Sequence, residues 1–297
     1  MKEQASDKYN DTLSKFNLNC DSLEIENELN KIQRKIETNN RLEVYKKILN
    51  FIDLTSLNVT DNDDNILAIT EKVNGFIDRF PDIDNVAAIC VFPRYAKLVS
   101  QSLEADNVMV ACVSGNFPSS QTFLEIKVAE TSLALFDGAD EIDIVMNVGM
   151  FINNDYEGLC DEIEEIKSVC KEKTLKVILE TSVFDSYSDI YKASLLAMYS
   201  GADFIKTSTG KESKGATPES VYIMCLAIRD YFKSCGKMVG IKPSGGINTI
   251  QEALMYYTIV DSILGEKWIN NKFFRIGASR LANRVLTGIL GTETTYF

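Results

Sequence analysis

A lysine stands at the end of an apolar run near the middle of this sequence. Residues 201–211 read GADFIKTSTGK, which predicts a short buried strand with Lys206 at its exit, followed by a polar turn that contains Gly210. Burying an ammonium group is unfavourable unless the group is paired or loses its proton. A lysine that loses its proton easily is a nucleophile that can form a Schiff base with a carbonyl compound. The alternative is a structural lysine whose ammonium group reaches out of the strand and binds a carboxylate.

A second lysine, Lys242, ends the next apolar run along the chain. Two ammonium groups in one cavity repel each other, and this repulsion lowers the pKa of at least one of them. A lysine of ordinary pKa is neutral in roughly one molecule per thousand or fewer at pH 7, so each unit of lowering raises the reactive fraction about tenfold. The structural alternative for Lys242 is an ion pair with Asp143 or Glu180.

The composition narrows the chemistry that is available. Histidine is absent from the 297 residues, which excludes a histidine base, a Ser-His-Asp triad and any histidine-ligated metal site. The net charge is −12 and no basic stripe occurs, so we expect neither nucleic acid nor an anionic membrane as a partner. The seven cysteines are scattered without a C-x-x-C pair, and neither a signal segment nor a membrane-length apolar run is seen. These features predict a reduced, cytoplasmic protein.

Strand-like and helix-like segments alternate from about residue 50 onwards. The expected strands are 50–54, 86–92, 108–113, 141–146, 175–180, 202–206, 238–242 and 273–276. The expected helices lie near 64–79, 94–102, 119–137, 155–172, 186–200, 217–234, 248–260 and 279–290. Strands that are apolar throughout, joined by short connections, are typical of a parallel sheet covered on both faces. The alternation predicts an α/β fold, a (β/α)8 TIM barrel.

The competing fold is an open doubly wound sheet. That fold requires a glycine-rich turn after the first strand, and residues 53–57, DLTSL, contain no glycine. Before the barrel, apolar residues at helical spacing in 22–49 predict one or two amphipathic helices, and the polar residues 1–22 are expected to be loose. We therefore expect an N-terminal helical extension, 1–49, that caps a single barrel domain, 50–297, with a short C-terminal tail.

Polar residues gather at the predicted strand exits. In this fold the active site is built at the carboxyl ends of the strands. The residues found there are Asp53, Thr55, Cys90, Asp143, Glu180, Lys206 and Lys242. Two lysines that end successive strands are more than a purely structural barrel needs.

The seventh and eighth exits carry small residues. Gly245 and Gly246 lie at one turn into a helix, and 277–279, GAS, lie at the next. Backbone N–H groups at such turns form a phosphate cradle, and this pair of loops is the usual phosphate position in the fold. Lys211 in the turn after Lys206 could add a charge. That turn is not a Walker loop, since position 205 is isoleucine.

At this point a resemblance can be recognised. The segments that carry it are 53–58 (DLTSLN), 90–95 (CVFPRY), 138–145 (GADEIDIV), 175–181 (LKVILET), 201–211 (GADFIKTSTGK) and 239–247 (VGIKPSGGI). Together they resemble the deoxyribose-phosphate aldolase family over about residues 50 to 290. The resemblance implies a cofactor-free class I aldolase on a (β/α)8 barrel, with no metal. Such enzymes interconvert 2-deoxy-D-ribose 5-phosphate with acetaldehyde and D-glyceraldehyde 3-phosphate.

The resemblance also implies roles for individual residues. Lys206 would be the Schiff-base lysine, Lys242 would lower its pKa, and Asp143 would relay protons through water. The residues implied in substrate binding are Asp53, Thr55, Cys90, Thr207, Gly210, Lys211, Gly245, Gly246 and Ser279. Asn248 and Arg280 depart from related bacterial enzymes, which often have arginine at the first position and serine at the second. Arg280 could therefore supply the positive charge that binds the phosphate.

Two other functions remain as alternatives. The chain could be a Schiff-base aldolase or transaldolase for another sugar phosphate, or a barrel that binds sugar phosphates without catalysis. The expected partners are a phosphorylated sugar and acetaldehyde. A homodimer, the family's usual form, is a further expectation.

Overall fold

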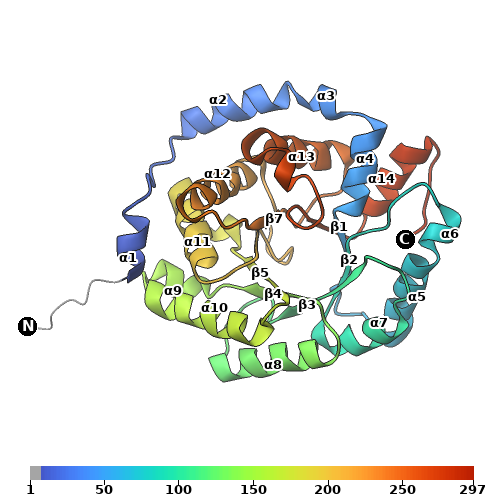
Figure 1. Ribbon diagram of the computed structural model, residues 1–297, viewed down its shortest axis with the longest axis horizontal. Coiled ribbons are helices and arrows are strands. Elements are labelled where there is room, and N and C mark those ends of the chain that lie inside the picture. The colour runs from blue at the N-terminus through green and yellow to red at the C-terminus, as the bar shows by residue number, and fades with distance from the viewer. Residues whose placement is uncertain (1–7) are drawn as a thin grey trace, which may run out of the picture.

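Eight parallel strands form a barrel at the centre of the molecule. The computed structural model describes residues 8–297 (Figure 1). The strands are β1 (Ile52–Thr55), β2 (Ala88–Val91), β3 (Met109–Ser114), β4 (Glu141–Val145), β5 (Thr174–Ile178), β6 (Phe204–Lys206), β7 (Gly240–Lys242) and β8 (Ile276–Ala278). They pair in the order β7-β6-β5-β4-β3-β2-β1-β8. Two isolated parallel bridges, Ile241 with Phe274 and Ser244 with Gly277, join the two ends of that order. The expected (β/α)8 barrel is confirmed.

Helices surround the barrel and connect its strands (Figure 1). Those that follow β1 to β4 are α5 (Asp63–Asn74), α6 (Phe76–Arg79), α7 (Ala96–Ser102), α8 (Leu124–Phe136), α9 (Val148–Ile152) and α10 (Tyr156–Cys170). Those that follow β5 to β8 are α11 (Tyr187–Tyr199), α12 (Pro218–Cys235), α13 (Ile250–Leu264) and α14 (Leu281–Leu290). Short 3-10 turns cover Pro93–Tyr95, Thr181–Val183 and Glu266–Trp268. No helix in residues 8–297 is long and apolar enough to cross a membrane.

The last strand begins later than the sequence predicts. The expected strand 273–276 is wrong, because the ladder with β1 starts only where Ile52 pairs with Ile276. Phe274 makes an isolated bridge to Ile241 and packs against Phe51, with ring centroids 5.3 Å apart. Arg275, which interrupts the apolar run, is buried among carboxylates. The strand exit therefore lies at Ala278, beside the loop that was expected to hold phosphate.

Four N-terminal helices run along the outside of the barrel. They are α1 (Lys8–Leu13), α2 (Ser22–Gln33), α3 (Ile36–Asn39) and α4 (Leu42–Asn50), and α2 and α3 arch past α12 and α13 in Figure 1. The segment 22–49 thus holds more helices than the one or two expected. The expectation of a loose start is wrong for residues 8–13, since they form a helix in which Tyr9 and Leu13 are buried. Residues 1–7 lie outside the described part.

The register of the strands places the two predicted catalytic lysines side by side. Lys206 pairs in register with Lys242 on one side and with Ile178 on the other, while Asp143 pairs with Lys176. Because alternate residues of a barrel strand point inward, these neighbours share the interior of the barrel. The interior is consequently polar near the carboxyl ends of β4 to β7.

Candidate active site

Lys206 and Lys242 share one carboxylate. Asp143 Oδ2 accepts hydrogen bonds from Lys206 Nζ at 2.9 Å and from Lys242 Nζ at 2.8 Å. Lys242 also pairs with Asp53. Lys242 and Asp143 are fully buried, whereas Lys206 retains 3% exposure and reaches the cavity described below. The two lysines and the aspartate predicted as catalytic are therefore in direct contact.

The surroundings move the pKa values of the two lysines in opposite directions. Burial lowers the pKa of Lys206, Asp143 raises it and Lys242 lowers it again, so the pKa lies below its ordinary value. Burial also lowers the pKa of Lys242, but Asp143 and Asp53 outweigh that effect and the pKa is raised. The pKa of Asp143 lies well below its ordinary value: burial raises it, and Lys176, Lys206 and Lys242 more than compensate. Lys206 is the base of this trio that releases its proton most easily.

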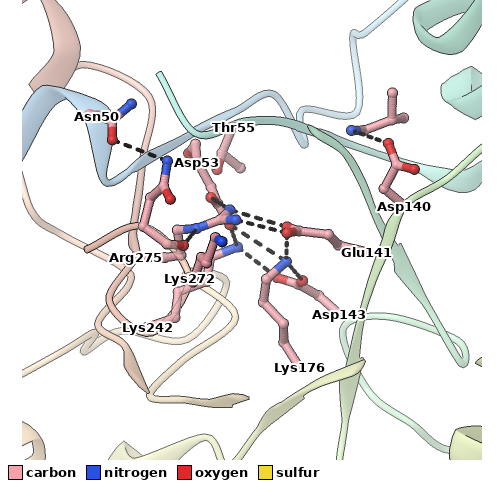
Figure 2. A network of polar contacts seen from close by, with 12 residues as sticks. Asn50, Asp53, Thr55, Asp140, Glu141, Asp143, Lys176, Lys242, Lys272 and Arg275 are labelled. Carbon is pink, nitrogen blue, oxygen red and sulfur yellow. Dashed lines mark hydrogen bonds and ion pairs between the residues drawn. The ribbon is translucent and has the colours of Figure 1, made fainter. Parts of the chain in front are cut away.

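A wider network of charges continues from Asp143 and Lys242 (Figure 2). Lys176 Nζ is 2.9 Å from Asp143 Oδ1 and 2.6 Å from Glu141 Oε2. Arg275 donates through Nη1 to Asp53 Oδ1 at 2.7 Å and through Nη2 to Glu141 Oε1 at 2.8 Å. Sequence reasoning missed Glu141, Lys176 and Arg275 as parts of the site. The available signal was Glu141 two positions before Asp143, on the same face of a strand.

A cavity of about 210 Å³ opens at the carboxyl ends of the strands. Of the predicted site residues, its lining contains Thr55, Lys206, Gly210, Lys211, Gly245, Gly246 and Ser279. It also contains Gly277 and Ala278 of the predicted phosphate loop 277–279, and residues that were not predicted as site residues, namely Leu57, Asn58, Thr209, Ser244, Ile247 and Asn248. The nucleophile and the glycine loops therefore face the same space.

Three predicted substrate-binding residues do not line that cavity. Asp53 is fully buried and paired with Lys242 and Arg275. Cys90 is fully buried in a small apolar cluster, and burial raises the pKa of its thiol. The Thr207 hydroxyl donates to the Ser244 carbonyl at 3.1 Å and accepts from the Ser244 amide at 2.9 Å. In this structure Asp53 orders Lys242 and Thr207 orders the β7 loop.

Glu180 joins the exits of β5 and β6. Its backbone is left-handed, with φ at 57°, and its carboxylate accepts from the Thr209 amide at 3.2 Å and from the Thr209 hydroxyl. Burial raises its pKa. Glu180 forms no ion pair with Lys242, so of the two structural partners expected for Lys242 only Asp143 is found. The carboxylate holds the turn between Lys206 and Lys211 in place, and Lys211 Nζ donates to the Leu57 carbonyl.

The two positions that depart from related enzymes lie around a second, larger cavity. This cavity of about 780 Å³ shares Asn248 and Ser279 with the first, and Arg280 lines the larger one alone. The C-terminal tail forms another part of its wall. Tyr296 packs against Phe76 and Phe80 and donates to the Lys72 carbonyl at 2.8 Å. The tail is thus held on α5 and α6 and does not line the cavity of Lys206.

Comparisons with known sequences agree with this geometry. The family model for DeoC/LacD family aldolases matches residues 47–280. A Caenorhabditis elegans relative is 38% identical over 271 residues, which are 91% of this chain and 89% of the relative. The deoxyribose-phosphate aldolases of Homo sapiens and Mus musculus are each 39% identical over 249 residues, which cover 80% of this chain and 78% of theirs.

Solved structures show the same architecture. The aldolase QR15 superposes with a TM-score of 0.65 at 29% identity, over 80% of this chain and 94% of its own. The deoxyribose phosphate aldolase of Aeropyrum pernix, described as tetrameric, gives a TM-score of 0.68 at 24% identity, over 86% of this chain and 96% of its own. At that identity the second likeness supports the fold alone.

Proposed function

This chain belongs to the DeoC/LacD aldolase family, and from that premise we propose that it is a class I aldolase for 2-deoxy-D-ribose 5-phosphate. The products would be acetaldehyde and D-glyceraldehyde 3-phosphate. The observation that carries the proposal is Lys206: it is buried, its pKa is lowered, and it opens on a cavity that two glycine loops also line. A lysine in that environment can act as a Schiff-base nucleophile.

Lys206 begins the reaction as a free amine. Its nitrogen attacks the C1 aldehyde of the open-chain sugar, and loss of water gives an iminium ion. A base then removes the proton from the C3 hydroxyl, and the C2–C3 bond breaks with release of D-glyceraldehyde 3-phosphate. The electron pair of that bond moves to the iminium to give an enamine. Protonation at C2 and hydrolysis release acetaldehyde and regenerate the amine. Asp143, which contacts Lys206 Nζ directly, would relay these protons through water.

Lys242 would keep Lys206 reactive. It stays protonated because it touches both Asp143 and Asp53, and its charge then opposes protonation of Lys206. This gives the two lysines different roles although they end adjacent strands.

The phosphate would bind at the β7 and β8 loops. Gly245 and Gly246 have φ values of 82° and 77°, which glycine adopts without strain, and both line the cavity with Ser279. Lys211 and Gly210 line the same space, and Gly210 lies beside Gly245. Thr55 would contact the sugar, while Asp53, Cys90 and Thr207 would act from behind the cavity lining. No metal or other cofactor is required in this scheme.

The test is to trap the Schiff base. Incubation with acetaldehyde and borohydride, followed by intact-protein mass and peptide mapping, should place one adduct on Lys206, and deoxyribose 5-phosphate should suppress it. Lys206→Leu should remove both the adduct and turnover. Lys211→Met is the matched control, because it removes a lysine from the same cavity and should leave the adduct in place. Full activity of Lys206→Leu, or an adduct elsewhere, would refute the mechanism.

We also propose that the protein works as a cytoplasmic homodimer in deoxyribonucleotide catabolism. A cytoplasmic site agrees with the seven cysteines, all of which are free thiols. The support for a dimer is α8, which exposes Phe123 at its start and then Ile126, Leu133 and Phe136. These residues recur at helical spacing and form an apolar stripe, defined here as the α8 stripe. A second copy of the chain is the proposed occupant, with the two stripes packed around a two-fold axis.

A further inference from the structure

The buried network contains one base more than it has acids. Its members, linked by ion pairs, are the carboxylates of Asp53, Glu141 and Asp143 and the bases Lys176, Lys206, Lys242 and Arg275. Each is at most 5% exposed. A buried cluster that carries a net charge is unfavourable, so the stable state of this cluster is the one in which one base is neutral.

Lys206 is the member that can be neutral at least cost. Arg275 stays protonated in proteins, Lys176 touches two carboxylates within 3 Å, and Lys242 touches Asp53 as well as Asp143. Lys206 touches only Asp143 and is the one base of the cluster that lines the cavity. The neutral base of the cluster is therefore Lys206, the residue whose nitrogen needs a free lone pair to attack an aldehyde.

We propose that Arg275 and Glu141 are positioning residues that set the charge balance of this network, in which Arg275 favours the free amine of Lys206 and Glu141 counterbalances Arg275. The proposal rests on the aldolase function above and adds two residues to it. Neither residue lines the cavity, so neither touches substrate. Arg275 connects Glu141 to Asp53, which in turn holds Lys242 (Figure 2). A change of charge at Arg275 or Glu141 therefore alters the electrostatic interactions of every member of the cluster.

The fold gives Arg275 a fixed place. Its guanidinium lies over the Phe204 ring, 5.9 Å from the centroid, at the residue two positions before Lys206 on β6. A side chain at position 240 would occupy the space of that ring, because a Cβ there would come within 2.3 Å of it. Gly240, Phe204 and Arg275 therefore form one packed unit that holds the charge within the barrel.

The other titratable groups that face Lys206 do not remove the imbalance. Cys90 on β2 has a raised pKa and is a neutral thiol. Glu180, after β5, is hydrogen-bonded to Thr209 and forms no ion pair with any base among residues 8–297. Lys211 lines the same cavity and adds a further positive charge beside Lys206. None of these three residues pairs with a member of the cluster, so the cluster still contains one base more than it has acids.

The test measures the titration of Lys206 without requiring turnover. The rate at which acetic anhydride labels Lys206 is followed against pH by peptide mass, alongside the pH profile of kcat/KM. Arg275→Met should move the labelling midpoint up by roughly one pH unit, with labelling and kcat/KM about tenfold lower below both midpoints. Glu141→Gln should move the midpoint down by a similar amount, because it removes a negative charge.

Two further variants separate charge balance from structural damage. The double variant Arg275→Met/Glu141→Gln removes one charge of each sign and should return the midpoint close to that of the wild type. Arg275→Lys keeps the charge and should leave the midpoint in place. Folding of each variant is checked by circular dichroism, and in the double variant Asp53 keeps Lys242 and Lys176 keeps Asp143 as partners.

Shifts of the two single variants in the same direction, or folded variants with unshifted midpoints, would overturn the proposal. So would a double variant whose midpoint stays displaced. Failure of the aldolase function would be recognised separately, as a wild-type protein that forms no acetaldehyde adduct while its Lys206 midpoint still responds to Arg275 and Glu141.

Discussion

At the scale of single residues, the two lysines show how neighbours decide reactivity. Lys206 and Lys242 occupy the same register position on adjacent strands and both lie at most 3% exposed. Lys242 contacts two carboxylates and Lys206 contacts one, and the pKa of the first is raised while that of the second is lowered. Burial lowers both pKa values, so the number of ion-pair partners determines which lysine can lose its proton.

Replacing Asp143 by asparagine should separate amine reactivity from proton transfer. The side chain keeps its shape and loses the charge that both lysines contact. Without that charge Lys206 is even easier to deprotonate, so acetaldehyde trapping on Lys206 should persist. Turnover should fall by about 10²- to 10⁴-fold, because the proton relay is lost. Steady-state rates and trapping are measured on the same samples.

The control for this variant is Asp155→Asn. Asp155 caps α10 on the surface, where asparagine caps equally well, so activity should stay unchanged. Turnover of Asp143→Asn within a few-fold of the wild type would contradict a relay role for Asp143.

The site could be predicted from the sequence only where residues stand at strand exits. Lys206, Lys211 and the β7 loop glycines were placed correctly on one cavity by counting strands. Lys176 and Arg275 lie within apolar runs, and no local pattern indicates that their side chains reach the same carboxylate, Glu141, one from β5 and the other from the segment just before β8. Such convergence depends on barrel closure, which joins residues far apart in the sequence.

At the scale of elements, close loop packing fixes the shape of the cavity. The loop after β6 and the loop after β7 meet at Gly215 and Gly245. A Cβ at Gly215 would come within 2.0 Å of the Gly245 carbonyl oxygen, and Gly245 itself has a positive φ. Glycine is required at both positions for different reasons, namely close approach at Gly215 and backbone conformation at Gly245.

The N-terminal helices should stabilise the barrel they cover. In α2, Ile25, Leu29 and Ile32 are buried, and the helix packs on α12 and α13. Leu29→Ala should lower the free energy of unfolding by about 2 to 4 kcal/mol, through lost apolar burial and the cavity left behind. Equilibrium denaturation in urea measures this loss, and the kcat of the folded protein should not change, because α2 does not reach the cavity.

Leu23→Ala on the same helix is the matched control. Leu23 is 67% exposed, so its truncation should change stability by less than about 0.5 kcal/mol. Equal effects of the two variants would mean that α2 does not pack on the barrel in solution.

Most helices and strands could be predicted from the sequence, and the errors in this prediction have physical causes. The barrel strands are short and mostly apolar, so most of them could be predicted, but β8 begins at Ile276 and not at Phe273 because Arg275 turns inward to the carboxylates. Helix α1 was missed because its buried residues, Tyr9 and Leu13, are too few to give a helical period. Their burial depends on contact with α10 and α11, which lie far along the chain.

At the scale of the whole molecule, apolar and electrostatic surface forces oppose each other. The chain carries a net charge of −12, which makes two copies repel. The α8 stripe exposes large apolar side chains, with Phe136 at 87% and Phe123 at 78% exposure. Salt screens the repulsion between copies and leaves the apolar attraction intact. Self-association through α8 should therefore strengthen as ionic strength rises.

A charge placed within the α8 stripe should prevent the proposed dimer from forming. Leu133 is 64% exposed on α8, and Leu133→Glu would bring two carboxylates together at a two-fold contact. Light scattering on a sizing column should give a dimer mass for the wild type and a monomer mass for this variant. Ile77→Glu is the control: Ile77 is 51% exposed on α6, outside the stripe, and its variant should remain a dimer. A wild-type monomer at high salt, or a Leu133→Glu dimer, would show that α8 does not pair with a second copy. Because Lys206 and its cavity are complete within one chain, the monomeric variant should keep its acetaldehyde adduct and its turnover.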